Sequence, residues 1–308
     1  MSRGDITAVP DSTDVYCVDT GMYDTDEYGA VYVVDAERPA LVDTGIGTNH
    51  EVIFDALDEL GVTPDVILPT HVHLDHAGGA GFLAERYPDA TVVVHEIGAP
   101  HLADPSRLVE GTKAAVGSQW KYYVEPKPVP EARIESLSGG ETVDLGDRDL
   151  DVHHAPGHAP HQVVVHDRGD DVLFAGDAAG IYVPGLDEIR QTTPPSQFDL
   201  GQCQEDVDLI RDLAPTVVCF GHFGPWRFDD DALAGYKRTL VEWVEAVKQR
   251  RAAERDDEAV VEHFAAHAPE KLIEEWSERK ARAEERLNTR GVLGYLDYRA
   301  NQRDAADE

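Results

Sequence analysis

The sequence predicts an α+β fold in which sheets are covered by helices, followed by a C-terminal helical appendage. Two features of the chain indicate this fold class. Short β-branched runs alternate with helical stretches through the first two-thirds of the sequence. After Trp226 the chain consists almost entirely of helix-forming residues as far as Arg290. We therefore expect a main domain over residues 1–226 and a helical extension over residues 227–308.

The predicted strands share one pattern, since each is a short run rich in β-branched residues and flanked by Gly, Pro or Asp. They lie at residues 14–18, 30–35, 40–43, 66–69, 91–95, 150–154, 162–166, 172–174 and 216–220. Helices are predicted where apolar residues recur at intervals of three and four, at 49–60, 77–87 and 201–213. Two stretches without clear periodicity, 103–131 and 180–198, are expected to be long loops that border a pocket.

The extension carries its own helix signals. Three consecutive aspartates at 229–231 suit the start of a helix, where negative charge meets the helix dipole. Pro269 suits the first turn of a later helix. We expect these helices to pack on the main domain and a polar tail to begin at about Asn301.

The chain is strongly acidic, because 60 Asp and Glu residues oppose 27 Lys and Arg, giving a formal net charge of −33. The acidic residues are spread along the whole sequence rather than gathered in a tail. We interpret this as halophilic adaptation to a salty cytoplasm, where salt screens the repulsion between carboxylates. An acidic surface for a basic partner is the alternative. A nucleic-acid partner is disfavoured, although high salt would weaken that argument.

The cysteines and the N-terminus bear on where the protein works. Cys17, Cys203 and Cys219 show no paired spacing, which is typical of a reducing compartment. The N-terminus lacks the apolar segment of a signal peptide, and no apolar run approaches the roughly 18 residues that span a membrane. We therefore expect a cytoplasmic protein without a membrane partner. A homodimer stays open.

The densest group of chemically active residues is the segment Thr70-His-Val-His-Leu-Asp-His-Ala-Gly-Gly79. It follows an apolar strand and precedes a helix, so its four polar side chains sit on a loop where they can converge. Imidazole nitrogen and carboxylate oxygen are ordinary ligands of zinc and similar ions. The segment therefore predicts a metal site.

Three later residues, each preceded by glycine, end apolar runs in the same way. They are His158, Asp177 and His222. Glycine lets the backbone turn tightly there and leaves the next side chain projecting from the sheet edge. A single such histidine is more typical of a turn, but three in a chain that already carries the cluster favour a shared site.

Together these residues resemble the signature of the metallo-β-lactamase superfamily over roughly residues 15–223. The resemblance implies an αββα sandwich with the metals at one edge, so that residues 1–226 would be the catalytic domain and residues 227–308 would wall the active site. It also implies a division of the ligands. The first metal would be held by His71, His73 and His158, the second by Asp75, His76 and His222, and Asp177 would bridge the two.

Residues beyond the ligand set are also expected at the site. Ala40-Leu-Val-Asp43-Thr-Gly45 resembles a second motif of the family, whose aspartate supports a ligand from behind. A carboxylate that accepts a ring N–H would fix that ligand's tautomer. A strand-ending turn is the alternative reading of Asp43. His161 and Tyr182 lie close in sequence to ligands and are expected to line the pocket.

The all-nitrogen and oxygen ligand set resembles the glyoxalase II and thioesterase-like branch, and also the nuclease branch, of the family. Two divalent ions about 3.5–4 Å apart can share a water and lower its pKa. We expect two zinc ions, with iron or manganese as alternatives. The bridging hydroxide would attack a small thioester or ester, and Asp75 would be the catalytic group that orients it and accepts its proton.

Three other functions stay open at this stage. Two-metal sites equally suit a ribonuclease or deoxyribonuclease that cleaves phosphodiesters. The chain could instead be a metal-binding protein whose helical appendage engages a partner. Iron-dependent redox chemistry, as in relatives that resemble sulfur dioxygenases, is the third alternative.

Overall fold

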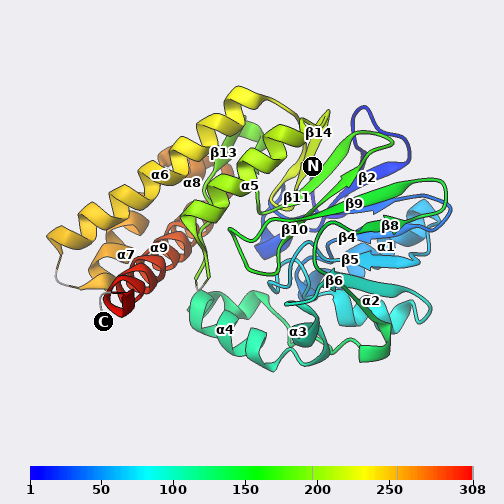
Figure 1. Cartoon of the computed structure of the whole chain (residues 1–308), viewed down its shortest axis with the longest axis horizontal. Coiled ribbons are helices and arrows are strands. Elements are labelled where there is room, and N and C mark those ends of the chain that lie inside the picture. Colours follow the sequence, from blue (N-terminus) through cyan, green and yellow to red (C-terminus); the bar gives the residue numbers. More distant parts are fainter. Residues whose placement is uncertain (196, 255, 307–308) are drawn as a thin grey trace.

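The strands build a sandwich of two large sheets. The computed structural model describes residues 1–195, 197–254 and 256–306, and in these ranges it contains a seven-stranded sheet, a six-stranded sheet and a two-stranded hairpin (Figure 1). The first sheet runs in the order β1 (Ile6–Ala8), β2 (Val15–Asp19), β3 (Ala30–Val34), β4 (Ala40–Val42), β5 (Val66–Leu68), β6 (Thr91–His95) and β7 (Ile134–Leu137). The second runs in the order β15 (Gly224–Arg227), β14 (Val217–Phe220), β11 (Val172–Gly176), β10 (Val163–Asp167), β9 (Asp149–His154) and β8 (Thr142–Asp144). The hairpin pairs β12 (Ile181–Val183) with β13 (Glu188–Arg190).

Helices cover the outer faces of both sheets. The helices beside the first sheet are α1 (His50–Leu60), α2 (Ala80–Arg86), α3 (Ala99–Ala103) and α4 (Ser106–Val116). α5 (Leu200–Leu213) and α6 (Asp230–Ala253) lie beside the second sheet, and α7 (Asp257–Ala266), α8 (Glu270–Trp276) and α9 (Glu278–Ala306) pack on α6 and on one another. Short 3₁₀ helices are η1 (Met22–Asp24), η2 (Gly47–Asn49), η3 (Gly117–Tyr122), η4 (Glu131–Arg133) and η5 (Pro184–Leu186). None of the described helices is both long and apolar enough to cross a membrane.

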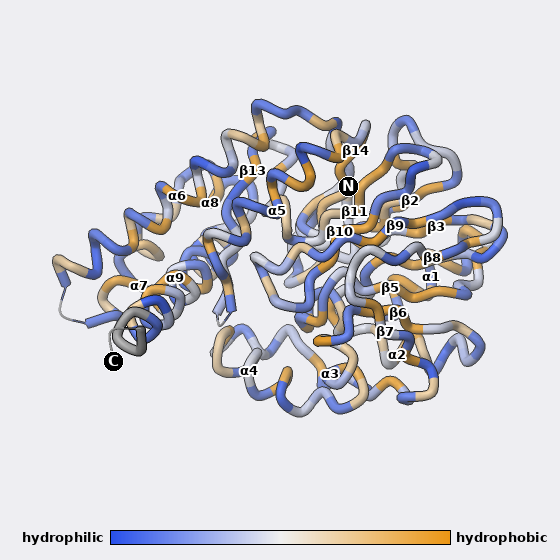
Figure 2. The backbone as a smooth tube through the Cα atoms, viewed as in Figure 1, coloured by the Kyte–Doolittle hydropathy of each residue, from blue (hydrophilic) through white to orange (hydrophobic). Residues whose placement is uncertain are grey.

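The alternation of side chains along the strands produces three hydrophobic cores, one between the sheets and one under the helices on each outer face. In β3, Tyr32 and Val34 point into the core between the sheets, whereas Val31 and Val33 point toward α1 and α2. Both sets are fully buried, which explains why the strands read as continuous apolar runs (Figure 2). In β11, Leu173 likewise packs under α5 and α6, in one cluster with the helical extension. The extension therefore shares a core with the second sheet.

The observed architecture confirms the predicted α+β sandwich with C-terminal helices. All nine predicted strands are present, and Asp229 caps α6 by accepting a hydrogen bond from the Ala232 amide, as the aspartate run predicts. Three expectations were wrong. The stretch 103–131 contains α4 and η3 rather than a long loop, and the stretch 180–198 contains the β12–β13 hairpin and η5. The helix α9 continues through Ala306 where a polar tail was expected from Asn301.

Truncation of a side chain between the sheets tests the packing. Phe174 is fully buried and its ring centroid lies 5.4 Å from that of Tyr32. Phe174→Ala should lower the free energy of unfolding by about 3–5 kcal/mol, because it removes buried surface and leaves a cavity. Val241→Ala, at a position 36% exposed, is the control and should change it by less than about 0.5 kcal/mol. Equal urea midpoints for both variants would contradict the sandwich core.

Candidate metal centre

The segments that carry the predicted ligands leave their strands at one edge of the sandwich. β4 and β5 are parallel, so the loops after them emerge together. β9, β11 and β14 also share one direction, because β10 is antiparallel to β9 and β11, and β14 is parallel to β11. The loops after β5, β9, β11 and β14 can therefore meet.

Tight turns and glycines bring these loops close. The amides of His76 and Ala77 both donate to the carbonyl of His73, at 3.0 and 2.8 Å. A Cβ on Gly79 would lie 2.3 Å from the carbonyl oxygen of Thr44, and one on Gly221 would lie 2.5 Å from His76 Cε1. Only glycine permits these approaches, so the backbone around the ligands depends on it.

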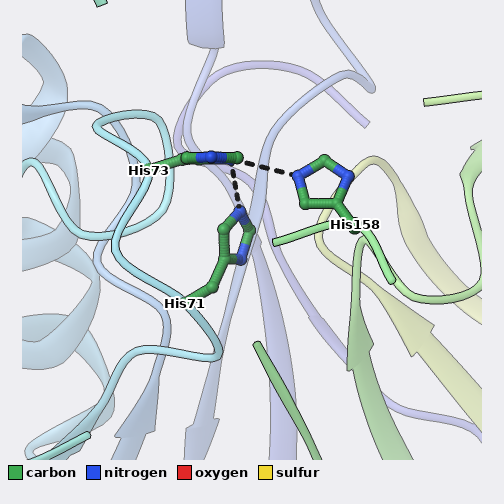
Figure 3. Close-up of side chains that lie close together, drawn as sticks. All are labelled: His71, His73 and His158. Carbon is green, nitrogen blue, oxygen red and sulfur yellow. Dashed lines mark hydrogen bonds between the residues drawn. The ribbon is translucent and has the colours of Figure 1, made fainter. Parts of the chain in front are cut away.

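Three histidines form the first ligand group (Figure 3). His71 Nε2 and His158 Nε2 each lie 3.0 Å from His73 Nδ1. One ligand atom from each residue falls within 4.8 Å of the other two. His71 and His158 are buried and His73 is half-buried, so the group is largely shielded from water.

A second group lies beside the first, and Asp177 lies between them. His76 Nε2 is 3.2 Å from His222 Nε2, which is 3.8 Å from Asp75 Oδ2. One oxygen of Asp177 is 3.3 Å from His158 Nε2 in the first group, and the other is 3.3 Å from His76 Nε2 in the second. The structure thus brings all seven predicted ligands together, in the arrangement that the resemblance implies.

The donor set fits a pair of metal ions. Ligand atoms about 2.0–2.1 Å from a tetrahedral zinc lie about 3.3 Å apart, close to the separations of 3.0–3.8 Å found here. Burial lowers the pKa of His158 to about 3 against the opposing charge of Asp177, and burial also holds the pKa of His71 well below its usual range. These imidazoles therefore keep a free lone pair. Asp177 Oδ1 is buried and accepts no hydrogen bond from the described residues.

Further polar groups hold the ligands from behind. Asp43 Oδ1 accepts hydrogen bonds from the amide and hydroxyl of Thr70, at 2.7 and 2.9 Å. Its Oδ2 lies 2.9 Å from His76 Nδ1, which donates to it and so leaves Nε2 free to face the centre. His222 is oriented in the same manner, because its Nδ1 donates to the carbonyl of Tyr28 at 2.9 Å. The structure thus places Asp43 where the sequence analysis expected a supporting carboxylate.

The ligands lie in the wall of a cavity of about 780 Å³. Residues of α4 and α9, including Leu108, Ala115 and Leu287, form much of the remaining lining. His161 also lines it, with Nδ1 accepting the Val72 amide at 3.3 Å. The expectation for Tyr182 does not hold, since the β12–β13 hairpin directs it into a different surface groove, where its hydroxyl donates to Asp187.

The sequence analysis missed several polar residues of the cavity. The hydroxyl of Tyr23 donates to Asp75 Oδ2 at 3.2 Å and also bonds the hydroxyl of Tyr123. On α9, the buried ammonium of Lys280 pairs with Glu284 and lies 3.6 Å from the ring centroid of Tyr28. No local pattern marks these residues, because their contacts join segments that are far apart in the chain.

Comparison with known protein sequences finds a family model and several relatives that match this chain. The family model of the Metallo-beta-lactamase superfamily matches residues 24–222. A "Metallo-beta-lactamase fold-containing protein ST1585" from Sulfurisphaera tokodaii is 31% identical over 215 residues, covering 68% of this chain and 78% of that protein. An "Acyl-coenzyme A thioesterase MBLAC2" from Bos taurus is 26% identical over 68% of this chain and 78% of its own length. A "Hydroxyacylglutathione hydrolase" from Pectobacterium atrosepticum is 27% identical over 64% and 62%.

Solved structures share the architecture. The crystal structure of ST1585 superposes with a TM-score of 0.69 at 24% identity, covering 92% of this chain and 99% of that one. The protein TTHA1429 from Thermus thermophilus superposes with a TM-score of 0.63 at 22% identity, covering 96% and 92%. At these identities the likeness is one of fold.

Replacement of the carboxylate behind His76 tests the assembly of the second ligand group. Asp43→Asn should weaken binding of one of two divalent ions by about 10- to 100-fold. The carboxylate accepts the Nδ1–H of His76 on one oxygen and the Thr70 amide and hydroxyl on the other, whereas an amide has only one accepting oxygen. Competition with a chromophoric chelator measures this. Asp35→Asn removes an equal charge at an exposed site and should bind as the wild type does. Wild-type affinity in Asp43→Asn would contradict the supporting role.

Proposed function

Because this chain belongs to the metallo-β-lactamase superfamily, we propose that it is a dinuclear-metal hydrolase that cleaves a thioester or ester. The observation that carries the proposal is the convergence of seven nitrogen and oxygen donors into two groups that share Asp177. Such a pair of sites suits hydrolysis.

Each ion would have its own ligands. His71, His73 and His158 would hold the first, Asp75, His76 and His222 the second, and Asp177 both. Bound there, two divalent ions would supply an activated water and polarise the substrate carbonyl. We propose zinc, which suits nitrogen and oxygen donors, with iron or manganese as alternatives.

The chain's own residues would supply proton transfer and orientation. Asp75 lines the cavity, and its half-buried carboxylate would accept the proton of the attacking water. A thiolate can leave without a proton donor, whereas an amine needs one. Neither Lys280, which is paired with Glu284, nor His161, whose Nδ1 accepts a backbone amide, is placed as a ready acid. This favours thioesters and esters over amides.

Thioesters are also the substrates that the names of two relatives imply, acyl-coenzyme A and hydroxyacylglutathione. The cavity of about 780 Å³ is large enough for a substrate of that general size. Its wall from α4 is largely apolar, whereas α9 contributes Leu287 together with charged side chains such as Lys280 and Arg290. A nuclease is less well supported, because a net charge of −33 repels a phosphate backbone. A purely partner-binding role would leave the open cavity beside the ligands without a use.

We further propose how the chain is divided and where it works. Residues 1–226 would form the catalytic domain, and residues 227–308 would wall its cavity through α9, which contributes Lys280, Glu284 and Leu287. Three free, buried cysteines suit a reducing cytoplasm. The dispersed acidic charge suits high salt.

Turnover of acyl thioesters tests the activity. Zinc-loaded protein should hydrolyse acyl-coenzyme A or other acyl thiols, with release of free thiol followed by a thiol-reactive dye in low and high KCl. His158→Ala should lower kcat at least about 100-fold, because it removes a donor from the first site. Metal-dependent cleavage of labelled RNA or DNA without thioester turnover would instead establish the nuclease alternative.

Metal removal should destabilise the protein, since ions that bind only the folded chain add to its stability. We expect dialysis against a chelator to lower Tm by several degrees, and zinc in twofold excess to restore it. Differential scanning calorimetry gives the measurement. A Tm that does not respond to chelator or zinc would contradict the proposed dinuclear site, whatever the substrate.

A further inference from the structure

Two tyrosine hydroxyls are hydrogen-bonded in series to the carboxylate of Asp75. Tyr23, in η1, donates to Asp75 Oδ2 at 3.2 Å, and its hydroxyl also bonds that of Tyr123, which follows η3. Both tyrosines line the cavity beside Asp75. The pair joins segments that are 100 residues apart, so it exists only in the folded protein.

The direction of this hydrogen-bonded chain follows from its chemistry. An ionised carboxylate only accepts hydrogen bonds, so Tyr23 must donate its single proton to Asp75. Tyr123 must then be the donor in the bond between the two hydroxyls. The order is therefore Tyr123 to Tyr23 to Asp75, and each bond polarises the next.

The surroundings hold Tyr23 firmly. Its ring centroid lies 5.8 Å from that of Tyr28, 6.0 Å from that of Tyr122 and 5.8 Å from that of Tyr123. Arg279 on α9 donates to its carbonyl at 2.8 Å. The backbone of Tyr23 has a φ of 57°, which is strained for a bulky residue and persists only where neighbouring contacts enforce it.

We propose that Tyr23, supported by Tyr123, is a positioning residue that fixes the carboxylate of Asp75 in the orientation needed by the second ligand group. Tyr23 takes one lone pair of Oδ2, the oxygen of Asp75 that lies 3.8 Å from His222 Nε2. The carboxylate then cannot rotate freely between His222 and the open cavity. The inference rests on the proposed hydrolytic function, in which Asp75 both holds a metal and accepts a proton.

Kinetics of hydroxyl-deleted variants provide the first test. Tyr23→Phe keeps the aromatic packing and should lower kcat about 10- to 100-fold, with a smaller change in KM. Tyr123→Phe should lower kcat less. The double variant should match Tyr23→Phe alone, because Tyr123 acts through Tyr23. Additive losses in the double variant would contradict the hydrogen-bonded chain from Tyr123 through Tyr23 to Asp75.

Tyr122→Phe is the matched control. Its ring packs on Tyr23, but Tyr122 does not line the cavity and its hydroxyl makes no hydrogen bond with the described residues. It should retain wild-type kcat and KM. A loss equal to that of Tyr23→Phe would show that the aromatic packing, rather than the hydroxyl chain, is responsible, and would overturn the proposal.

Binding of cobalt(II) provides a readout that does not depend on turnover. In Tyr23→Phe, one of the two ions should bind about 10- to 100-fold more weakly with an altered visible absorption spectrum, while the other binds as in the wild type. Wild-type binding of both ions, or equal weakening of both with a lowered Tm, would overturn the inference. If the wild type cleaves no thioester, the proposed function fails, yet this titration still decides the role of Tyr23.

Discussion

The rest of the site depends on one constraint, that buried imidazoles converge with ring nitrogens facing one another where water barely reaches. His71, His76, His158 and His222 are all nearly inaccessible to water, and protonating them together would place several charges within a few ångströms. Hydrogen bonds to the Nδ1 atoms of two of these rings fix how the rings are oriented. Asp43 takes the Nδ1–H of His76 and the Tyr28 carbonyl takes that of His222, so Nε2 in each ring points inward toward the other ligands. The arrangement is costly in an empty protein and favourable around cations.

The sandwich makes this convergence possible because strand direction and glycine act together. The parallel relation of β11 to β14, and of β4 to β5, sends the loops that carry Asp177, His222, Asp43 and His71 to one edge. Glycines at the ends of those strands let the loops approach more closely than any other residue would allow, as the contact of Gly221 with His76 demonstrates. The close-packed core behind them, in which Phe174 meets Tyr32, keeps the edge rigid.

The sequence predicted those features of the fold and site that are determined by neighbouring residues in the chain. A strand buried on both faces must be apolar throughout, so the runs around Val33 and Leu173 stand out. The His and Asp residues at the ends of these runs also stand out, because they follow directly on an apolar segment. By contrast, α4 buries only Val109 and turns Leu108 and Ala115 to the cavity, and β8 is a short edge strand with mostly exposed residues. Tyr182 is near Asp177 in sequence, yet a tight hairpin turns it away.

The helical extension is joined to the ligands more closely than its place at the end of the chain suggests. Tyr28 is the connection. Its carbonyl orients His222, its ring lies 4.7 Å from that imidazole and 5.4 Å from Trp276 of α8, and its hydroxyl donates to Glu284 of α9 at 2.8 Å. Lys280 neutralises Glu284 and covers the same ring. Because a buried carboxylate without its cation is strongly destabilising, the Lys280–Glu284 pair keeps α9 in place against Tyr28. The segment that orients a ligand is therefore held from the other side by the helices, and the extension acts as a structural part of the centre as well as a wall of its cavity.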